Sequence, residues 1–447
     1  MSSKKGDERL RFISRLTLNI RDWLYPIKIS RFRRNFIVIA RANALVQGLS
    51  LFATPVLTRL YSPDDFGVAA LFSSVLSLFL AFSTLRFEWS IPNAKSKGQA
   101  ASLILIGFLI LLSISTTLFV LTILFDIRLN ILEELEILNS FITLLPLALV
   151  GGGLHQLMHA WYIRETQLSA VARSQVTQRI GSTAINLVGG FLDLGALCLV
   201  SGTVAAMGLG ISILLQQAEG LKKNLFQLSY KRVWVSFLRF WQESVLSTGV
   251  AVANSASLTA IPILLSQNYS ATEIGWYALM NRLALTPVSL FTSAIGQIFW
   301  AEAAVLVKQD QVSLWRLYLK ATKTLMLLAI PIIVICLLGP FFVGQLFGSE
   351  DWKPAGVILT ALTPMLLGQI VVSPLSHLVV HRKQHWQLIW DLCRLIFTVS
   401  TIIILGSMST KIEILILILS VTNLGMYSLI FYLNLLCLKD EGYSKAT

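Results

Sequence analysis

Long apolar stretches with few charged residues set the main constraint on how this chain folds. Segments such as 103–112 and 412–419 are almost continuously apolar. A helix needs about 20 mostly apolar residues to cross a bilayer, whereas strands of a membrane barrel alternate apolar and polar residues. Of the 447 residues, 55% are hydrophobic and only 13% are charged. These features predict an all-α polytopic membrane protein and leave little length for a water-soluble catalytic domain.

The apolar stretches divide into two sets of six expected helices. We place them at residues 36–58, 67–88, 100–125, 138–160, 177–192 and 200–218, then at 244–266, 275–298, 322–344, 355–379, 386–406 and 412–436. The domains expected from them are an N-lobe at 36–220, a basic cytoplasmic linker at 221–243, a C-lobe at 244–436 and a cytoplasmic tail at 437–447.

The distribution of charge predicts the orientation in the membrane. With the N-terminus placed inside, 28 of the 36 Lys and Arg residues fall on the cytoplasmic side. The outer side carries an acidic cluster of Asp126, Glu133, Glu134 and Glu136. Because translocation of Lys and Arg is disfavoured, both termini are expected in the cytoplasm. The net charge of +13 then reflects topology, and nucleic acid is not expected as a partner.

The first 35 residues are basic and lack the features of a cleavable signal. Ile13, Leu16, Ile20 and Leu24 recur at helical spacing, which favours an amphipathic helix lying on the inner leaflet. A solvated basic tail is the alternative interpretation of the same residues.

A short segment recurs in the two halves of the chain. The first copy reads Tyr-Ser-Pro-Asp-Asp-Phe-Gly at 61–67, and the second reads Tyr-Ser-Ala-Thr-Glu-Ile-Gly at 269–275. The two tyrosines are 208 residues apart, and six expected helices separate the copies. Both six-helix bundles are therefore expected to cross the membrane in the same direction. Chance similarity of two polar turns is the alternative, because these residue types are common in turns.

Parallel repeats of this kind are related by a pseudo-twofold axis along the membrane normal, and the substrate path lies between the bundles. The sequence therefore predicts a transporter with a central cavity. In each turn, Ser62 and Ser270 are expected to cap the following helix. The acids three residues later lie at its electropositive first turn. The glycines at 67 and 275 are expected to permit close approach of neighbouring helices.

Two regions resemble a known family. Residues 55–67 together with 85–91, which read Leu-Arg-Phe-Glu-Trp-Ser-Ile, are similar to the start of bacterial Wzx-type oligosaccharide flippases, and residues 275–297 are similar to their eighth helix. The resemblance implies the fold of the multidrug/oligosaccharidyl-lipid/polysaccharide (MOP) exporter superfamily, in which two six-helix lobes surround a cavity that opens alternately to each side. It also implies transport of an undecaprenyl-pyrophosphate-linked oligosaccharide for O-antigen (lipopolysaccharide) or exopolysaccharide synthesis. The expected partners are this lipid-linked glycan, membrane lipids and other polysaccharide assembly proteins.

Ionisable residues within the expected spans are the candidates for the site, because at that depth they face protein or water. Arginine suits phosphate, since its planar group donates two hydrogen bonds at once. The lipid II flippases of the same superfamily use cavity arginines on the first, second and eighth helices, which here carry Arg41, Arg86 and Arg282. The substrate-binding candidates are Arg282, Arg394, Arg41 and Arg86, with Asn43, Gln47 and Asn254 as partners for sugar hydroxyls. For each of them, a structural contact between helices is the alternative role.

Asp391 lies three residues before Arg394 on the same helix face, so the two are able to pair with each other. If the pair faces the cavity instead, Asp391 is the candidate that couples flipping to a gradient of H⁺ or Na⁺. No other cofactor is expected.

Four histidines are paired at a spacing of four residues, as His155 with His159 and His381 with His385. Each pair shares a helix face at the expected inner end of its helix, but no acid follows the first histidine of either pair as in metalloproteases. We therefore expect interfacial polar residues and no metal site.

Three functions are compatible with these features of the sequence. The leading one is transport of a lipid-linked oligosaccharide without any enzymatic step. Export of small-molecule drugs on the same fold is the second, although a cavity for cationic drugs favours acids over arginines. A membrane-embedded glycan polymerase or ligase is the third, and the short outer loops expected here argue against it.

Overall fold

The computed structural model describes residues 30–124, 141–309, 311–348, 350–375 and 384–444, and within these ranges the chain is helical and contains no strand. The expected all-α architecture is confirmed. The proposed interfacial helix before residue 30, the acidic cluster, His377 and His381 lie outside the described residues, as do the last three residues of the tail.

The described part of the N-terminal half forms six long helices and three short ones. They are α2 (Ser30–Leu60), α3 (Pro63–Leu80), α4 (Phe87–Ser90), α5 (Lys97–Leu124), η1 (Ile142–Leu144), α7 (Leu145–Arg164), α8 (Leu168–Phe191), α9 (Ala196–Gln216) and α10 (Glu219–Phe226).

The C-terminal half repeats this plan with some interruptions. Its elements are α11 (Tyr230–Leu265), α12 (Ala271–Gln309), α13 (Gln311–Leu337), α14 (Gly339–Phe347), η2 (Glu350–Trp352), α15 (Lys353–Ala361), α16 (Thr363–Val371), η3 (Ser373–Leu375), α17 (Gln384–Ser407) and α18 (Ile412–Ser444).

Seven of the described helices are long and apolar enough to cross a membrane, namely α3, α5, α7 with η1, α9, α13, α17 and α18. Two further spans are bent by 48°, one within α11 and one between α15 and α16. Pro262 and Pro364 lie next to these bends, and proline removes a backbone hydrogen bond and clashes with the preceding turn. The long helices α2, α8 and α12 are not among the helices that pass this test over the described residues.

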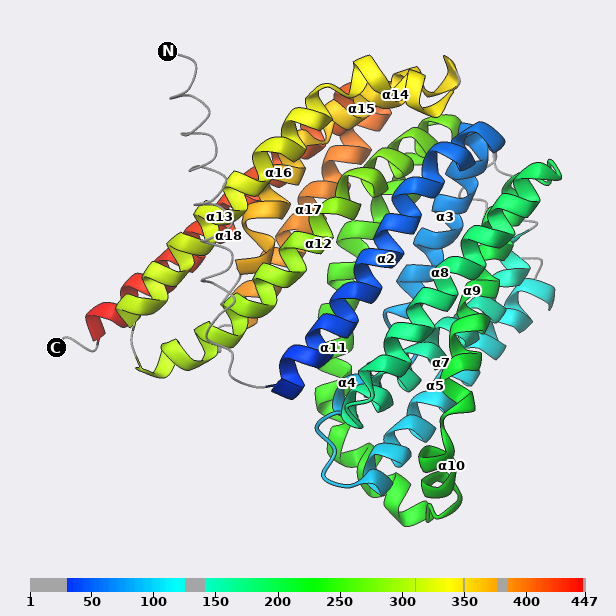
Figure 1. The fold of residues 1–447 in the computed structure, drawn as a ribbon, viewed down its shortest axis with the longest axis vertical. Coiled ribbons are helices and arrows are strands. Elements are labelled where there is room, and N and C mark those ends of the chain that lie inside the picture. Colours follow the sequence, from blue (N-terminus) through cyan, green and yellow to red (C-terminus); the bar gives the residue numbers. More distant parts are fainter. Residues whose placement is uncertain (1–29, 125–140, 310, 349, 376–383, 445–447) are drawn as a thin grey trace, which may run out of the picture.

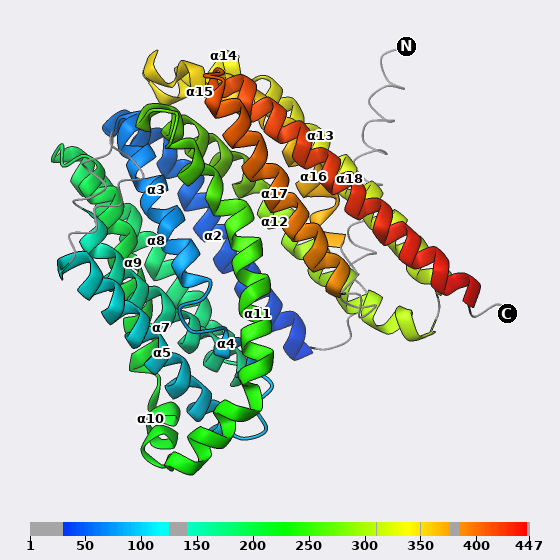
Figure 2. The same cartoon turned by 180° about the vertical axis from the view of Figure 1, so that it is seen from behind.

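The two halves form two lobes that lean together at one end and separate toward the other (Figures 1 and 2). The end at which α2 finishes and α3 begins is called the closed end below, and the opposite end is called the open end. The largest cluster of buried apolar side chains includes Tyr61 and Phe66 of the first half and Tyr277 and Trp352 of the second. The lobes thus share one apolar core at the closed end.

Three helices begin well before the sequence indicates. Helix α8 begins at Leu168 and not at residue 177, α11 begins at Tyr230 and not at 244, and α13 begins at Gln311 and not at 322. The expected linker at 221–243 is therefore largely helical, formed by α10 and the first third of α11. Helix α10 is amphipathic, with Leu221 buried and Lys222 and Lys223 exposed. Hydropathy misses these turns because they are rich in polar residues.

The repeated turns have the same local structure in both halves, which confirms the internal repeat. Ser62 accepts a hydrogen bond from the Asp65 amide at 3.3 Å, and Ser270 accepts one from the Glu273 amide at 3.4 Å. In return, the side chains of Asp65 and Glu273 each accept a bond from the backbone of the capping serine at 3.0 Å. Both turns are capping boxes, which satisfy amide groups that the start of a helix leaves free.

The two turns meet each other across the closed end. A Cβ atom added at Gly67 would lie 2.0 Å from the carbonyl oxygen of Ala271, and one added at Gly275 would lie 1.9 Å from that of Pro63. These contacts are reciprocal, because Pro63 corresponds to Ala271 and Gly67 to Gly275 at the repeat spacing of 208 residues. A pseudo-twofold axis therefore passes between α3 and α12, as in an isologous dimer interface.

Trp352 closes the same end from the C-terminal half. Its indole N–H donates to the carbonyl oxygen of Thr58 at 3.2 Å, and its ring meets that of Phe66 edge-on with centroids 5.4 Å apart. The side chain is 1% exposed. Bonds and aromatic packing therefore join the lobes at the closed end.

Candidate functional site

Helices α2 and α12 carry polar side chains within their apolar stretches and meet where the two lobes face each other. Helix α2 packs against α8, and α12 packs against both α3 and α2. Polar side chains are costly against lipid, so helices of this kind are tolerated where they line water or protein. The seam between the lobes is therefore the candidate site.

Two arginines from opposite lobes lie at matching depth in this seam. Arg282 is eleven residues from the start of α12, or about 16 Å from the closed end at 1.5 Å per residue. Arg179 is twelve residues from the end of α8, or about 18 Å from the same end. The charge of Arg179 acts on Arg282, so the two guanidinium groups are close enough to interact electrostatically.

Neither arginine is neutralised by a carboxylate among the described residues. Arg282 is exposed to solvent in the middle of a long helix, and Arg179 is half-buried. Two unpaired like charges repel each other, and an anion placed between them removes that repulsion and accepts charge-assisted hydrogen bonds from both. The arrangement is therefore suited to a phosphate or diphosphate group.

A polar contact between α2 and α12 lies nearer the open end. The Gln47 side-chain amide donates to the Ser289 hydroxyl at 3.3 Å. Asn43 is half-buried one turn before Gln47, on the same helix face. Arg41 is exposed, but it is only two residues from Asn43 and so projects from the opposite face of α2. Gln47 and Asn43 thus belong to the seam, whereas Arg41 does not share their face.

Arg86 is not in a membrane-spanning helix, which corrects the sequence-based expectation. Helix α3 ends at Leu80, and Leu85 and Arg86 adopt positive φ angles of 45° and 57° that turn the chain sharply. This turn brings the Arg86 Nε atom to 3.9 Å from a carboxylate oxygen of Glu88, although the two residues would point apart on a helix. The guanidinium also stacks on the Trp89 ring at 4.4 Å from its centroid. These contacts give Arg86 a structural role next to α4.

Asp391 and Arg394 lie inside the C-terminal lobe and contact each other. Both are 5% exposed, and an Asp391 oxygen lies 3.4 Å from Arg394 Nη2. Arg394 also donates to the Tyr427 hydroxyl and to the Asn254 side-chain oxygen, each at 3.2 Å, and stacks on Trp390. In the structure, Asp391 and Arg394 are thus paired with each other, and within this cluster only Asn254 is exposed.

Replacing Asp391 by asparagine is expected to lower the free energy of unfolding by about 3–5 kcal/mol, because it leaves the buried Arg394 without its counter-charge. Replacing both residues, as Asp391→Asn with Arg394→Gln, is expected to recover part of this loss. Thermal unfolding of the purified protein in detergent measures both effects. The matched control is Glu350→Gln in the exposed pair with Lys353. That control should change stability little, and an equal loss there would contradict the assignment.

His155 and His159 lie in the interior of the N-terminal lobe. His155 is midway along α7, not at its inner end, because this helix continues to Arg164. His155 Nε2 lies 3.1 Å from the Ser174 hydroxyl, which donates its own hydrogen to the Gly210 carbonyl oxygen at 2.8 Å. Nε2 therefore carries the hydrogen of the His155–Ser174 bond. No cluster of three potential metal ligands occurs in the described part of the chain.

The structure adds Arg179, which was not among the candidates taken from the sequence. Its helix was expected to begin at residue 177, so Arg179 stood at the margin of a span. Residues 168–191 form one continuous helix, and this is what places Arg179 within the bundle. The first half of this helix is polar and carries Arg173, Gln175, Gln178 and Arg179.

Comparison with known proteins agrees with this geometry. A family model described as "Polysaccharide biosynthesis protein" matches residues 56–356. No curated protein matches the sequence.

Several solved structures are similar in fold. An inward-facing multidrug resistance MATE family transporter of the MOP superfamily has a TM-score of 0.68 at 12% identity, covering 89% of this chain and 95% of that chain. The lipid II flippase MurJ, in an inward closed conformation, has a TM-score of 0.68 at 16% identity, covering 91% and 93%. An outward-facing MATE transporter has a TM-score of 0.53 at 11% identity, covering 91% and 96%.

These matches confirm the twelve-helix, two-repeat fold of the MOP superfamily and the resemblance noted in the sequence. Because the family model covers more than half of its length, this multi-pass membrane protein belongs to the polysaccharide biosynthesis protein family.

Proposed function

We propose that the protein is a flippase that moves undecaprenyl-pyrophosphate-linked oligosaccharide units across the bacterial inner membrane, for O-antigen or exopolysaccharide synthesis. The observation that carries the proposal is a pair of arginines, Arg179 and Arg282, that lie at similar depth in opposite lobes, interact electrostatically and have no carboxylate partner among the described residues. No covalent step is part of the proposed transport, so the protein does not act as an enzyme.

The physical problem of flipping such a lipid is the passage of its head group. A diphosphate and its sugars lose their hydrogen bonds to water inside hydrocarbon, which costs several kcal/mol for each unsatisfied polar group. Two guanidinium groups at mid-depth offset this cost for the diphosphate. The amides of Gln47 and Asn43, farther toward the open end, offer hydrogen bonds to the sugars. The lipid tail stays in the bilayer while the head lies between the lobes.

The proposed mechanism is alternating access, in which the lobes rock about the closed end and then separate there. The distribution of Lys and Arg supports an open end that faces the cytoplasm, with both termini on that side. The higher TM-scores to the inward-facing MATE transporter and to the inward closed flippase support the same orientation. In this state the substrate reaches the arginines from the inner leaflet.

The driving force is proposed to be a gradient of H⁺ or Na⁺. Asp391 was the candidate for coupling, but Arg394 neutralises it in this conformation. If a cation binds Asp391 during transport, Arg394 must move away from it first.

Drug export is the second function to test, because the similar structures include multidrug transporters. The charge of the seam distinguishes the two, since cationic drugs are repelled by Arg179 and Arg282. We expect an unlabelled anionic lipid-linked glycan to compete with a labelled one for the site. A cationic dye is not expected to compete with it.

Purified protein in liposomes is expected to move a fluorescent undecaprenyl-pyrophosphate-linked glycan from one leaflet to the other, detected by a membrane-impermeant quencher or glycosidase. Protein-free liposomes are the first control. The mass of the glycan should be the same before and after the assay. A newly formed glycosidic bond would favour the function of a polymerase or ligase instead. Absence of movement, in liposomes where the protein is correctly folded and oriented, would contradict the flippase proposal.

A further inference from the structure

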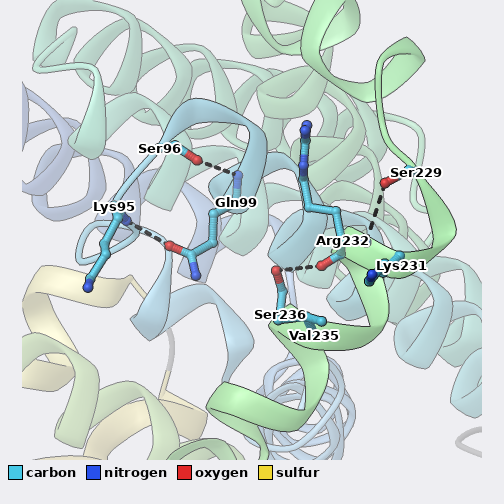
Figure 3. Close-up of a pocket in the computed structure, with 8 residues that line it drawn as sticks. All are labelled: Lys95, Ser96, Gln99, Ser229, Lys231, Arg232, Val235 and Ser236. Atoms are coloured by element: carbon cyan, nitrogen blue, oxygen red, sulfur yellow. Dashed lines mark hydrogen bonds between the residues drawn. The ribbon is translucent and has the colours of Figure 1, made fainter.

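A second basic site lies at the open end, apart from the arginines of the seam. A pocket of about 450 Å³ opens between the start of α5 and the start of α11 (Figure 3). Its lining includes three cationic side chains, Lys95, Lys231 and Arg232, and no carboxylate. All three side chains are exposed.

The cations of this pocket have no partner of opposite charge among the described residues. A neighbouring carboxylate, Glu165, is held outside the pocket by Lys97 at 2.6 Å and Arg164 at 2.9 Å. The pocket therefore keeps a local charge of +3 that nothing in the described chain neutralises. Such a concave cluster attracts an anion.

Two helix starts contribute further to the positive potential. The Gln99 amide donates to the Ser96 hydroxyl at 3.1 Å where α5 begins, and the Arg232 amide donates to the Ser229 hydroxyl at 3.4 Å where α11 begins. The N-terminus of a helix carries a partial positive charge that favours anions. Figure 3 shows these two starts facing each other across the pocket. Gly98 lets the Arg232 guanidinium lie against α5, since an added Cβ would be 3.0 Å from its Nη1 atom.

An aromatic band lies beside the pocket and points to a membrane-bound occupant. Trp234 is 50% exposed and Trp241 is 40% exposed, and both rings pack on Phe237 between them. Trp89, 63% exposed, lies on the adjoining α4. Tryptophan is enriched at the level of lipid head groups, where its apolar ring and polar N–H are both satisfied. A phosphate held by Lys231 and Arg232 is thus at the level of the bilayer surface.

We propose that this pocket binds the phosphate head group of an anionic phospholipid in the leaflet at the open end. The bound lipid joins α5 of the N-terminal lobe to the first turns of α11, and its acyl chains lie along the aromatic band. This inference rests on the pocket and the band alone, and it holds whether or not the protein is the flippase proposed above.

Native mass spectrometry of the full-length protein tests the proposal, with phosphatidylglycerol and phosphatidylcholine of identical acyl chains as probes. The wild-type protein is expected to bind phosphatidylglycerol more tightly than phosphatidylcholine. The double variant Lys231→Gln/Arg232→Gln is expected to weaken phosphatidylglycerol binding about 30-fold, from the loss of two cations near a lipid phosphate. The control variant Lys222→Gln/Lys223→Gln removes the same charge from exposed positions on α10 and should bind as the wild type does.

A charge-preserving variant, Lys231→Arg/Arg232→Lys, should retain binding, and thermal unfolding verifies that each variant is folded. Equal binding of the two lipids, or unchanged binding by the neutralised double variant, would overturn the proposal. Competition by inorganic phosphate at the concentration of the lipid would assign the pocket to a free anion instead. A double variant that still binds phosphatidylglycerol but no longer flips the glycan would assign it to the transported substrate, which also overturns the lipid assignment.

Discussion

Replacing Arg282 by alanine is expected to reduce flipping of the lipid-linked glycan about 10- to 100-fold, because a hydrogen bond to a charged group contributes about 1.5–3 kcal/mol. The same loss is expected for Arg179→Ala, since both guanidinium groups face one anion. Initial rates in the liposome assay provide the measurement. The double alanine variant should lose less than the product of the two single losses, because residues that share one ligand are coupled.

Two further variants separate charge from geometry at this pair. Arg282→Lys is expected to retain part of the rate, since lysine keeps the charge but cannot donate two parallel hydrogen bonds to a diphosphate. Arg173→Ala is the matched control, because Arg173 is an exposed arginine of α8 that lies on a different face from Arg179. If Arg282→Ala and Arg179→Ala both flip the glycan at the wild-type rate, the two arginines do not belong to the binding site.

Replacing Gly67 or Gly275 by alanine is expected to prevent the closed end from packing as it does in this structure. The added methyl group would lie about 2 Å from a backbone carbonyl oxygen, and backbone cannot move aside as a flexible side chain does. Overpacking of this kind costs about 1–3 kcal/mol. The lobes are therefore expected to separate at the closed end, with transport strongly reduced.

Chemical labelling measures this separation. A cysteine introduced at Thr58, which is buried beneath Trp352, should react with a membrane-impermeant thiol reagent in Gly67→Ala or Gly275→Ala protein and resist it otherwise. Gly48→Ala is the control, because nothing lies within 4 Å of a Cβ added there. If the glycine variants transport normally and leave the cysteine protected, the close contact of α3 and α12 is not essential.

The repeated turns could be predicted in detail because their structure depends on local chemistry. A serine followed three residues later by an acid forms a capping box wherever a helix begins, and a glycine at the crossing permits close approach. Ser62, Ser270 and the glycines at 67 and 275 therefore behave as their residue types indicate. That the two turns contact each other across an axis depends on the packing of the lobes, which local sequence does not specify.

Arg86 and Arg179 show where the sequence was insufficient. Hydropathy alone continued the second span through Arg86, because no glycine or proline marks the positive φ angles at Leu85 and Arg86. It also began the fifth span nine residues late, which left Arg179 at the margin of that span, because the first turns of α8 are rich in polar residues. Arg282 was identified correctly as lying deep in its helix, whereas the partner across the seam became apparent only from the tertiary arrangement.

One further contact lies on the pseudo-twofold axis, where the Thr272 hydroxyl donates to the Asp64 carboxylate from the equivalent position of the other half. A homodimer of identical halves would place two copies of one residue opposite each other here, either two carboxylates that repel or two threonines without an ionic acceptor. Covalent fusion removes this restriction, since each half can vary alone. The unequal pair at 64 and 272 is therefore a bond that a homodimer of identical halves could not make.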